Sequence, residues 1–206
     1  GVWGYIYDIS INPKNRQNIF VVTSDAFGEY VFRSINCGND WVYVTGCEAS
    51  SYMNVVIDQN NPDNVYYYLK RSTDNGITWE NNFFKDEIIG VHPINSNTLY
   101  CSDRNTIKVS YDWGVTFNEL VTYSNWTTPV PGIVNLIFDK KIPEIMMFCT
   151  PNNGIHYSND SGENWHVLKG SYEKRTLDAI PLPDMEKIYI ATHGDGVWVE
   201  IGRANV

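Results

Sequence analysis

The chain has 206 residues, with 15 Lys and Arg against 24 Asp and Glu, which gives a formal net charge of −9. This acidic balance excludes a general nucleic-acid binder, because such proteins need a basic face to displace counterions from the phosphate backbone. Hydrophobic residues make up 43% of the chain, which excludes a disordered protein, and no run of about 18 apolar residues exists that could insert into a membrane.

The composition favours an all-β fold. Tyr and Trp are frequent, with 14 and 7 copies, whereas charged residues make up only 19% of the chain. Aromatic and β-branched residues between turn formers are typical of strands. In chain order, strands that end in turns are expected at 7–13, 54–58, 89–93, 135–139 and 176–180. Each is followed by an apolar strand, at 19–22, 65–68, 99–101, 145–148 and 188–192.

An eight-residue pattern, S-x-D-x-G-x-T-W, follows the first four of these strand pairs. It is complete at 72–79, has Phe for Trp at 110–117, has Asn for Thr at 158–165, and is degenerate at 34–41, where Asn36 replaces the Asp. The Asp can accept backbone N–H bonds in its own turn, the Gly supplies an unusual backbone angle, and the aromatic ring packs the turn onto the sheet. The residues expected to shape these turns are Ser34, Gly38, Trp41, Asp74, Gly76, Trp79, Asp112, Gly114, Phe117, Asp160, Gly162 and Trp165.

These octets resemble the Asp-box, or BNR repeat, of sialidases, xyloglucan-active glycoside hydrolases, sortilin-like receptors and photosystem assembly factors. The resemblance implies a β-propeller of four-stranded antiparallel blades, in which the boxes stabilise the fold and do no chemistry. Repeats of about 40 to 50 residues have the size of a propeller blade. The chain is therefore expected to be a single propeller domain, either a five-bladed ring or part of a larger propeller, with blades at 1–48, 49–84, 85–122, 123–170 and 171–206.

Three stretches depart from this repeat. Only eight positions separate Asn64 from Ser72, so the second blade has either a very tight turn near Leu69 and Lys70 or a missing loop. Residues 123–132 form a long loop, and long loops often carry recognition. The fifth blade has no box and no visible fourth strand.

The first strand of each blade is expected to line a central channel. At one equivalent position, four of the five blades place a polar residue on an otherwise apolar strand; the residues are Asp8, Asn54, Ile88, Asn135 and Asp178. A polar ring at a channel mouth is typical of a small-ligand or glycan site. The alternative is that these groups only bond the backbone or ordered water where the strands converge.

Asp8 and Asp178 are candidate catalytic carboxylates. They become neighbours if five blades close into a ring, and paired carboxylates are the usual groups of glycoside hydrolysis. The segment 3–13 looks like the xyloglucanase segment in which an Asp precedes a turn with Asn or Asp before Pro, and this resemblance assigns Asp8 as acid or base. The enzymes it resembles form their cleft between two seven-bladed propellers, so a length of 206 residues argues against catalysis. The Arg-Ile-Pro motif of sialidases is absent near the first strand.

Aromatic residues are the candidates for binding without catalysis, because Trp and Tyr stack on the apolar faces of sugars. Trp126 in the long loop is the first candidate, followed by Trp113 at a box tip and Trp3 near the start. The boxes and strand packing explain the other Trp residues.

The sequence predicts no cofactor and no metal site, because the four His residues are scattered and no CxxC pair occurs. Cys101 and Cys149 fall in apolar strands and are expected to be buried thiols. Cys37 and Cys47 flank one strand, and either a local disulfide or two free thiols is possible there. Asn125 and Asn159 begin N-glycosylation sequons, and Asn125 is expected to be the accessible one.

The sequence therefore predicts an exported, extracellular propeller that binds a glycan or a protein through its channel face and the loop at 122–131. The first alternative is a glycoside hydrolase related to the xyloglucanases. The second is a structural or assembly scaffold with no ligand. Neither a nucleic-acid partner nor membrane insertion is expected, and the oligomeric state is left open.

Overall fold

The structure is a computed structural model that describes residues 4–47, 54–103, 106–122, 135–139, 141–150, 153–171, 176–181, 187–192 and 196–201. Within these residues the chain forms 18 strands, arranged in five antiparallel sheets, and no helix. No helix that could cross a membrane is therefore found in the described part of the chain. The predicted all-β propeller is confirmed.

Each sheet is one blade, built from consecutive strands. Blade 1 contains β1 (Tyr5–Ile11), β2 (Ile19–Ser24), β3 (Glu29–Ser34) and β4 (Val42–Cys47). Blade 2 contains β5 (Val55–Ile57), β6 (Val65–Tyr67) and β7 (Lys70–Ser72). Blade 3 contains β8 (Glu87–Val91), β9 (Leu99–Ser102), β10 (Thr106–Ser110) and β11 (Asn118–Thr122). Blade 4 contains β12 (Leu136–Phe138), β13 (Met146–Thr150), β14 (Gly154–Ser158) and β15 (His166–Val167), and blade 5 contains β16 (Thr176–Pro181), β17 (Lys187–Thr192) and β18 (Gly196–Ile201).

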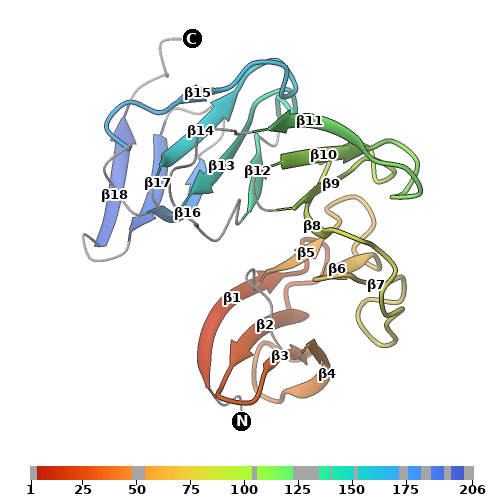
Figure 1. Ribbon diagram of the computed structural model, residues 1–206. Coiled ribbons are helices and arrows are strands. Elements are labelled where there is room, and N and C mark those ends of the chain that lie inside the picture. Colours follow the sequence, from red (N-terminus) through yellow and green to blue (C-terminus); the bar gives the residue numbers. More distant parts are fainter. Residues whose placement is uncertain are drawn as a thin grey trace.

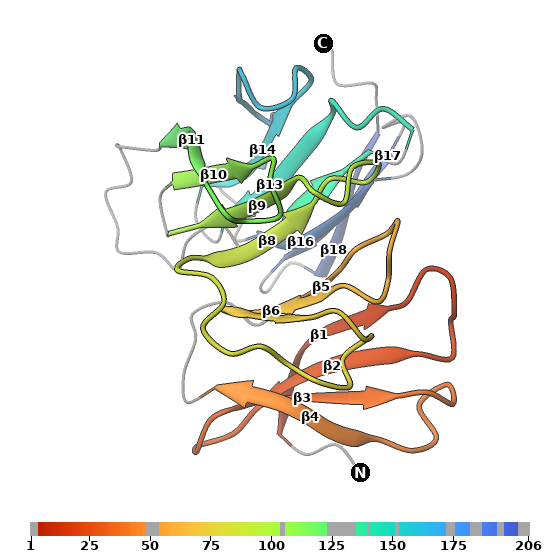
Figure 2. The ribbon, with the colours of Figure 1, turned by 90° about the vertical axis from the view of Figure 1, so that its right-hand side faces the viewer.

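The five blades follow one another around a common centre (Figures 1 and 2), from blade 1 in red to blade 5 in blue. The inner strands β1, β5 and β8 each contact the inner strand of the next blade, and blade 4 contacts blade 5 through β13 and β16. β1 and β16 are not among the extensively contacting pairs of described strands. Blades 1 and 5 therefore form the two ends of the series.

The hydrophobic core lies in layers between neighbouring blades. Between blades 1 and 2, the fully buried Val22 and Val31 pack with Val55 and Tyr67. Similar clusters join blade 2 to blade 3, blade 3 to blade 4, and blade 4 to blade 5. Because each strand alternates its side chains between two faces, an internal blade is apolar on both faces.

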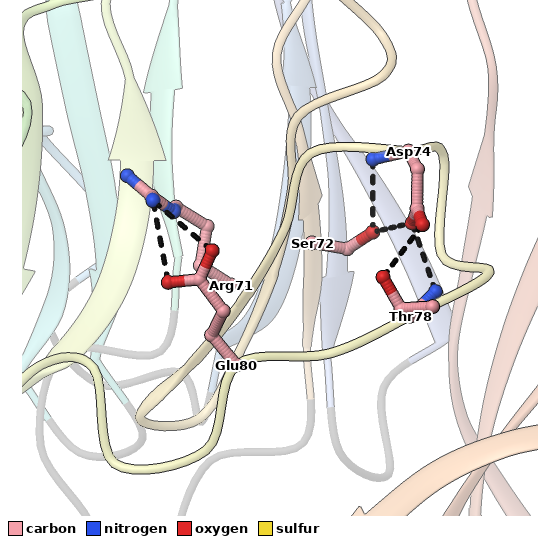
Figure 3. Close-up of polar contacts among 5 residues, drawn as sticks. All are labelled: Arg71, Ser72, Asp74, Thr78 and Glu80. Atoms are coloured by element: carbon pink, nitrogen blue, oxygen red, sulfur yellow. Dashed lines mark hydrogen bonds and ion pairs between the residues drawn. The ribbon is translucent and has the colours of Figure 1, made fainter.

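The three well-matched octets form the same turn. In each, the Ser hydroxyl accepts a bond from the Gly N–H and donates to one Asp oxygen, with distances of 2.7–2.9 Å. The other Asp oxygen accepts a bond from the side chain four residues later, as Asp74 does from Thr78 at 2.6 Å in Figure 3. These bonds hold the pKa of Asp74, Asp112 and Asp160 at about 2.

The degenerate turn of blade 1 reaches the same geometry with donor and acceptor exchanged. Asn36 Oδ1 accepts the Ser34 hydroxyl at 3.0 Å, and Asn36 Nδ2 donates to the Asp40 carboxylate at 2.8 Å. The amide and carboxylate have changed places relative to Asp160 and Asn164 of the fourth blade. The unusual sequence of this copy is therefore a compensated pair of changes.

The glycine of these turns also lies against the preceding blade. Gly76 has a φ of +79°, and a Cβ at this position would lie 2.5 Å from the Phe20 ring of blade 1. Gly162 similarly approaches Leu120 of blade 3. Glycine is therefore required here both for its backbone angle and for the close contact between blades.

Blade 2 is shortened at its outer edge. β6 and β7 are joined by Tyr68 and Leu69 alone, with Tyr68 at a φ of +54°, so the very tight turn is the alternative that the structure shows. In place of a fourth strand, Glu80 forms an isolated bridge to Arg71, and the Arg71 guanidinium contacts the Glu80 carboxylate at 3.2 Å (Figure 3).

All four cysteines are free thiols, and Cys101 and Cys149 are buried as expected. Cys37 lies at the exposed tip of the first octet, whereas Cys47 lies at the opposite end of β4. Cys47 Sγ contacts Glu29 Oε2 and Tyr67 Oη, each at 3.4 Å. Of the two possibilities for Cys37 and Cys47, the structure therefore contains the free thiols.

Candidate channel site

A cavity of about 670 Å³ lies where the five inner strands converge. Its wall is mainly aliphatic and includes Ile9, Val56, Ile89, Ile137 and Ile180. The polar side chains that line it are Ser10, Gln59, Asn135, Asp139 and Asp178. A volume of this size and an apolar wall with a few polar groups are typical of small-ligand sites.

In blades 1, 3 and 5 the strand register places a polar residue at one level of the inner strand, and in blade 3 it corrects the sequence alignment. Positions are counted along the first strand of each blade, starting from the turn that joins it to the second strand. At the fourth paired position Asp8 lies opposite Val22 in blade 1, and Asp178 lies opposite Ala191 in blade 5. In blade 3 this fourth position is Glu87, paired with Ser102, because a bulge at Ile89 shifts the register by one residue. Sequence spacing alone gave Ile88, since a bulge leaves no signal in the residue count.

The Asp8 carboxylate joins blade 1 to blade 2. Its Oδ2 accepts the Val55 N–H at 2.9 Å and the Ser10 hydroxyl at 3.1 Å, and Ser10 also donates to the Val55 carbonyl at 2.7 Å. Burial raises the pKa of Asp8, the bonds from Val55 and Ser10 oppose this rise, and the negative charge of Asp178 adds to it. The carboxylate therefore has a structural acceptor role at this blade interface.

Asp178 and Asn135 come together on the cavity wall. The Asp178 Oδ1 accepts the Ala179 N–H at 2.8 Å, and the carboxylate also bonds the Asn135 side chain. Loss of water beside the wall raises the pKa of Asp178, although the residue as a whole is exposed, and the two bonds oppose this rise. Asn135 thus links blade 4 to blade 5 at the level where Asp8 links blade 1 to blade 2.

Glu87 is a buried carboxyl without a hydrogen bond or ion pair among the described residues. Burial raises its pKa to about 9, and the nearby negative charge of Glu29 contributes to this rise. Glu87 is therefore protonated at neutral pH. It does not line the cavity, and it adds no negative charge to the channel at pH 7.

Asp139 lies on the same wall, at the turn that follows β12. Its Oδ1 accepts the N–H groups of Lys141 and Ile142, at 2.7 and 2.9 Å, and closes the turn after β12. Its Oδ2 is buried and has no hydrogen-bond partner among the described residues. The sequence pattern predicts a strand and a turn over residues 135–139, but the lack of a partner for Asp139 depends on packing that the pattern does not show.

Other predicted binding residues lie apart from this wall or outside the described residues. Trp113 is half-exposed at the tip of the blade 3 octet, with a φ of +64°, and does not line the cavity. Asn54 is half-buried just before β5. Trp3 and Trp126 lie outside the described residues, as does Asn125, so their roles stay predictions. The described residues include no group of three or more His, Cys, Asp or Glu side chains arranged to hold a metal ion.

Comparison with protein-family models and with curated proteins finds no match. Among solved structures, the chain is similar to a GH74 enzyme of Niastella koreensis, with 18% identity and a TM-score of 0.73 over 98% of this chain and 36% of that chain. It is similar to a GH74 xyloglucanase of Xanthomonas campestris, with 17% identity and a TM-score of 0.69 over 95% of this chain and 36% of that chain.

The chain is also similar to a chain of a nidogen–laminin complex, with 14% identity and a TM-score of 0.66 over 91% of this chain and 72% of that chain. It spans about a third of the length of the two GH74 proteins. At these identities the likeness establishes the β-propeller fold alone.

Proposed function

We propose that this chain is a ligand-binding propeller module whose binding surface is the central cavity. The observation that carries the proposal is the cavity itself, with a continuous aliphatic wall and polar groups at Asn135, Asp139 and Asp178. Phe138 is the one aromatic residue on the described wall. Because sugar sites use stacked aromatic rings, this wall favours an apolar segment of a protein partner over a glycan.

The same proposal includes the finer features expected from the sequence. The recurring turns fit Asp-boxes with a structural role, because their carboxylates are fully engaged within the turn. Export to the extracellular space is proposed from the fold resemblance and the sequon at Asn125. Expression through a glycosylating secretory pathway tests it: glycan attachment at Asn125 in secreted protein is expected, and retention of the chain inside the cell contradicts it.

Binding is tested by immobilising the chain and passing a peptide library and a panel of polysaccharides over it. Ile180 lines the cavity and is 62% exposed, so Ile180→Arg obstructs the cavity without burying a charge. Ile77→Arg is the matched control, since Ile77 is similarly exposed at 66% but lies in an octet turn. Retention that is lost in Ile180→Arg and kept in Ile77→Arg supports the proposal. Equal retention by both variants, or none by the wild type, contradicts it.

A polysaccharide that is retained identifies a glycan partner instead, and Trp126→Ala then tests whether the long loop contributes. Loss of retention in this variant assigns Trp126 to the binding surface. Unchanged retention removes Trp126 from the site.

Glycoside hydrolysis is the second candidate, favoured by the raised pKa values of Asp8 and Asp178 and by their electrostatic interaction. Against it stands the Asp8 carboxylate, which is bound to the backbone of blade 2. Release of reducing sugar from xyloglucan by the wild type, lost in both Asp8→Asn and Asp178→Asn, supports hydrolysis. No release by folded wild type removes this candidate.

A further inference from the structure

The chemistry of the cavity defines the kind of ligand that fits it. The only charged side chains on the described wall are the carboxylates of Asp139 and Asp178. The five inner strands, β1, β5, β8, β12 and β16, contain neither Lys nor Arg. An anionic ligand therefore finds no partner here, whereas a cation with an aliphatic body meets both the acidic groups and the apolar wall.

Comparison of blade 4 with blade 2 shows why Asp139 lacks a partner. Asp58 occupies the same turn position in blade 2, where its Oδ1 accepts the N–H groups of Asn60 and Asn61 and its Oδ2 accepts the Asn64 side chain at 3.3 Å. The residue equivalent to Asn64 in blade 4 is Ile145, because the carbonyl oxygen of each accepts the backbone N–H of the turn Asp. Isoleucine cannot donate a hydrogen bond, so the Asp139 Oδ2 is left without one.

An unpaired buried carboxylate oxygen is costly, since burial removes its water without supplying a donor. Asp139 is 1% exposed and lines the cavity, whereas the fully bonded Asp58 does not line it. Of these two turn aspartates, the one that lines the cavity is therefore the one that lacks a donor. Because the Asp139 Oδ2 lies beneath the cavity surface, a donor brought by a ligand reaches it when the carboxylate turns toward the cavity.

The second acidic group, Asp178, is held by Asn135 at the other end of β12. Four residues of strand separate Asn135 from Asp139, which corresponds to about 13 Å along the wall. The wall between the two ends is made by Leu136, Ile137 and Phe138. The acidic groups are thus separated by an apolar stretch about as long as an extended eight-carbon chain.

From this arrangement we propose that the cavity binds an elongated aliphatic amine, with one ammonium group at Asp139 and an apolar chain along β12 that reaches toward Asp178. The source of the amine is either a free diamine or polyamine or the lysine side chain of a partner protein. The inference rests on the proposed function, because it names the ligand class of the same cavity.

Isothermal titration with 1,8-diaminooctane at low salt tests the inference, with 1,8-octanediol as the uncharged control of equal length. One saturable site is expected, with the diol binding at least tenfold more weakly. Asp139→Asn is expected to weaken the diamine at least tenfold, and Asp178→Asn is expected to weaken it less because that residue is more exposed. Asp58→Asn is the matched control and is expected to leave the affinity unchanged.

A second variant protects the test against loss of folding. Ile145→Asn gives Asp139 the donor that Asn64 gives Asp58, so it is expected to weaken the diamine while keeping the charge of the cavity. A lysine-containing peptide and its norleucine analogue, titrated in the same way, distinguish a protein source from a free amine.

Two results overturn the inference: no binding of either amine by folded wild type, or binding that Asp139→Asn and Ile145→Asn leave unchanged. Retention of a neutral peptide or polysaccharide that Ile180→Arg abolishes, in the absence of amine binding, leaves the proposed function standing and removes only the amine. If Ile180→Arg weakens the binding of no ligand, both the proposed function and the amine inference are removed.

Discussion

Blades 1 and 2 share an internal interface, whereas blades 1 and 5 each have one end face at the two ends of the series. The same residue types occur in the interface and on the end faces, but they differ in burial. Val31 in β3 is 0% exposed against blade 2, whereas Val197, its register equivalent in blade 5, is 71% exposed. Val55 is 3% exposed against blade 1, whereas its equivalent Ile9 is 57% exposed. Every repeat therefore carries the apolar pattern, but a position contributes to the free energy of unfolding only where a neighbouring blade buries it.

The largest expected effect is a charge placed at equivalent positions of the two regions. Val31→Asp buries an unpaired carboxylate between blades and is expected to cost about 4 kcal/mol or more, which is enough to unfold a marginally stable domain. Val197→Asp is expected to change the free energy of unfolding by less than about 0.5 kcal/mol, as exposed substitutions usually do. Urea denaturation of both variants measures the difference. Equal costs contradict the comparison.

The turn glycines give the next largest difference. Gly76→Ala forces a Cβ against Phe20 of blade 1 and strains a residue at positive φ, so a loss of about 3 kcal/mol is expected. Gly38→Ala keeps the strain but meets only Trp41 of its own turn, at 3.4 Å, so about 1 kcal/mol is expected. Thermal unfolding of the pair separates strain from contact between blades. A larger loss for Gly38→Ala would show that strain, and not contact, dominates.

Glu87 and Asp178 occupy the same register position, one inside the series and one at its end. The folded-state pKa of Glu87 is about 9, above its unfolded value, so the stability it contributes is complete below about pH 4.5 and is lost as pH rises toward 9. Glu87→Gln is expected to raise the free energy of unfolding by about 4 to 5 kcal/mol at pH 8 and to have little effect at pH 4. Asp178→Asn, at an exposed residue, is expected to show a much smaller pH dependence.

Denaturation curves at pH 4, 6 and 8 measure this effect, with the exposed Glu163→Gln as control. A Glu87→Gln variant that is less stable than the wild type at pH 8 contradicts the assignment of a protonated, buried carboxyl.

The smallest expected effect comes from exchanging the polar pair of the second octet, in internal blade 2, for the pair found in the first octet, in end blade 1. Asp74→Asn removes the acceptor for Thr78 and is expected to cost about 1 kcal/mol. Adding Thr78→Asp recreates the Asn36–Asp40 pair of blade 1 and is expected to recover most of that loss. A double-mutant cycle measures the coupling between the two positions. No recovery in the double variant shows that the exchange depends on other parts of the first turn.

Acid unfolding gives a related test. The pKa of about 2 for Asp74, Asp112 and Asp160 lies below their unfolded values, so the stability these carboxylates contribute is present above about pH 4. It is expected to be lost between about pH 4 and pH 2. A wild type whose stability stays constant across this range contradicts the turn bonding.

Most of the fold was predictable because the octets carry it locally. Ser72, Asp74 and Gly76 satisfy one another within a single turn, so their spacing alone predicts the hairpin and its repeat. The register agrees with the predicted polar position at Asp8 and Asp178 and differs in blade 3, where the bulge at Ile89 moves Glu87 into the position. A bulge is set by strand pairing and is invisible to a residue count.

The site was less predictable for the same reason. Asp8 carries the residue type of a catalytic carboxylate, but only the packing of blade 2 shows that Val55 occupies its oxygen. Asp139 reads as an ordinary turn residue, and only the neighbouring Ile145 leaves its second oxygen without a donor. The packing around each carboxylate, between blades for Asp8 and within blade 4 for Asp139, therefore decides its role.

Methyl NMR of chain labelled at isoleucine tests most directly that the cavity is the binding surface, with 1,8-diaminooctane and, separately, the lysine-containing peptide as titrants. The prediction is that at least one titrant shifts the methyl signals of isoleucines on the cavity wall, among them Ile9, Ile89, Ile137 and Ile180. The signals of the exposed Ile77 and Ile94, which do not line the cavity, are expected to stay in place. Shifts confined to Ile77 and Ile94, or equal shifts at all six residues, contradict a binding site in the cavity.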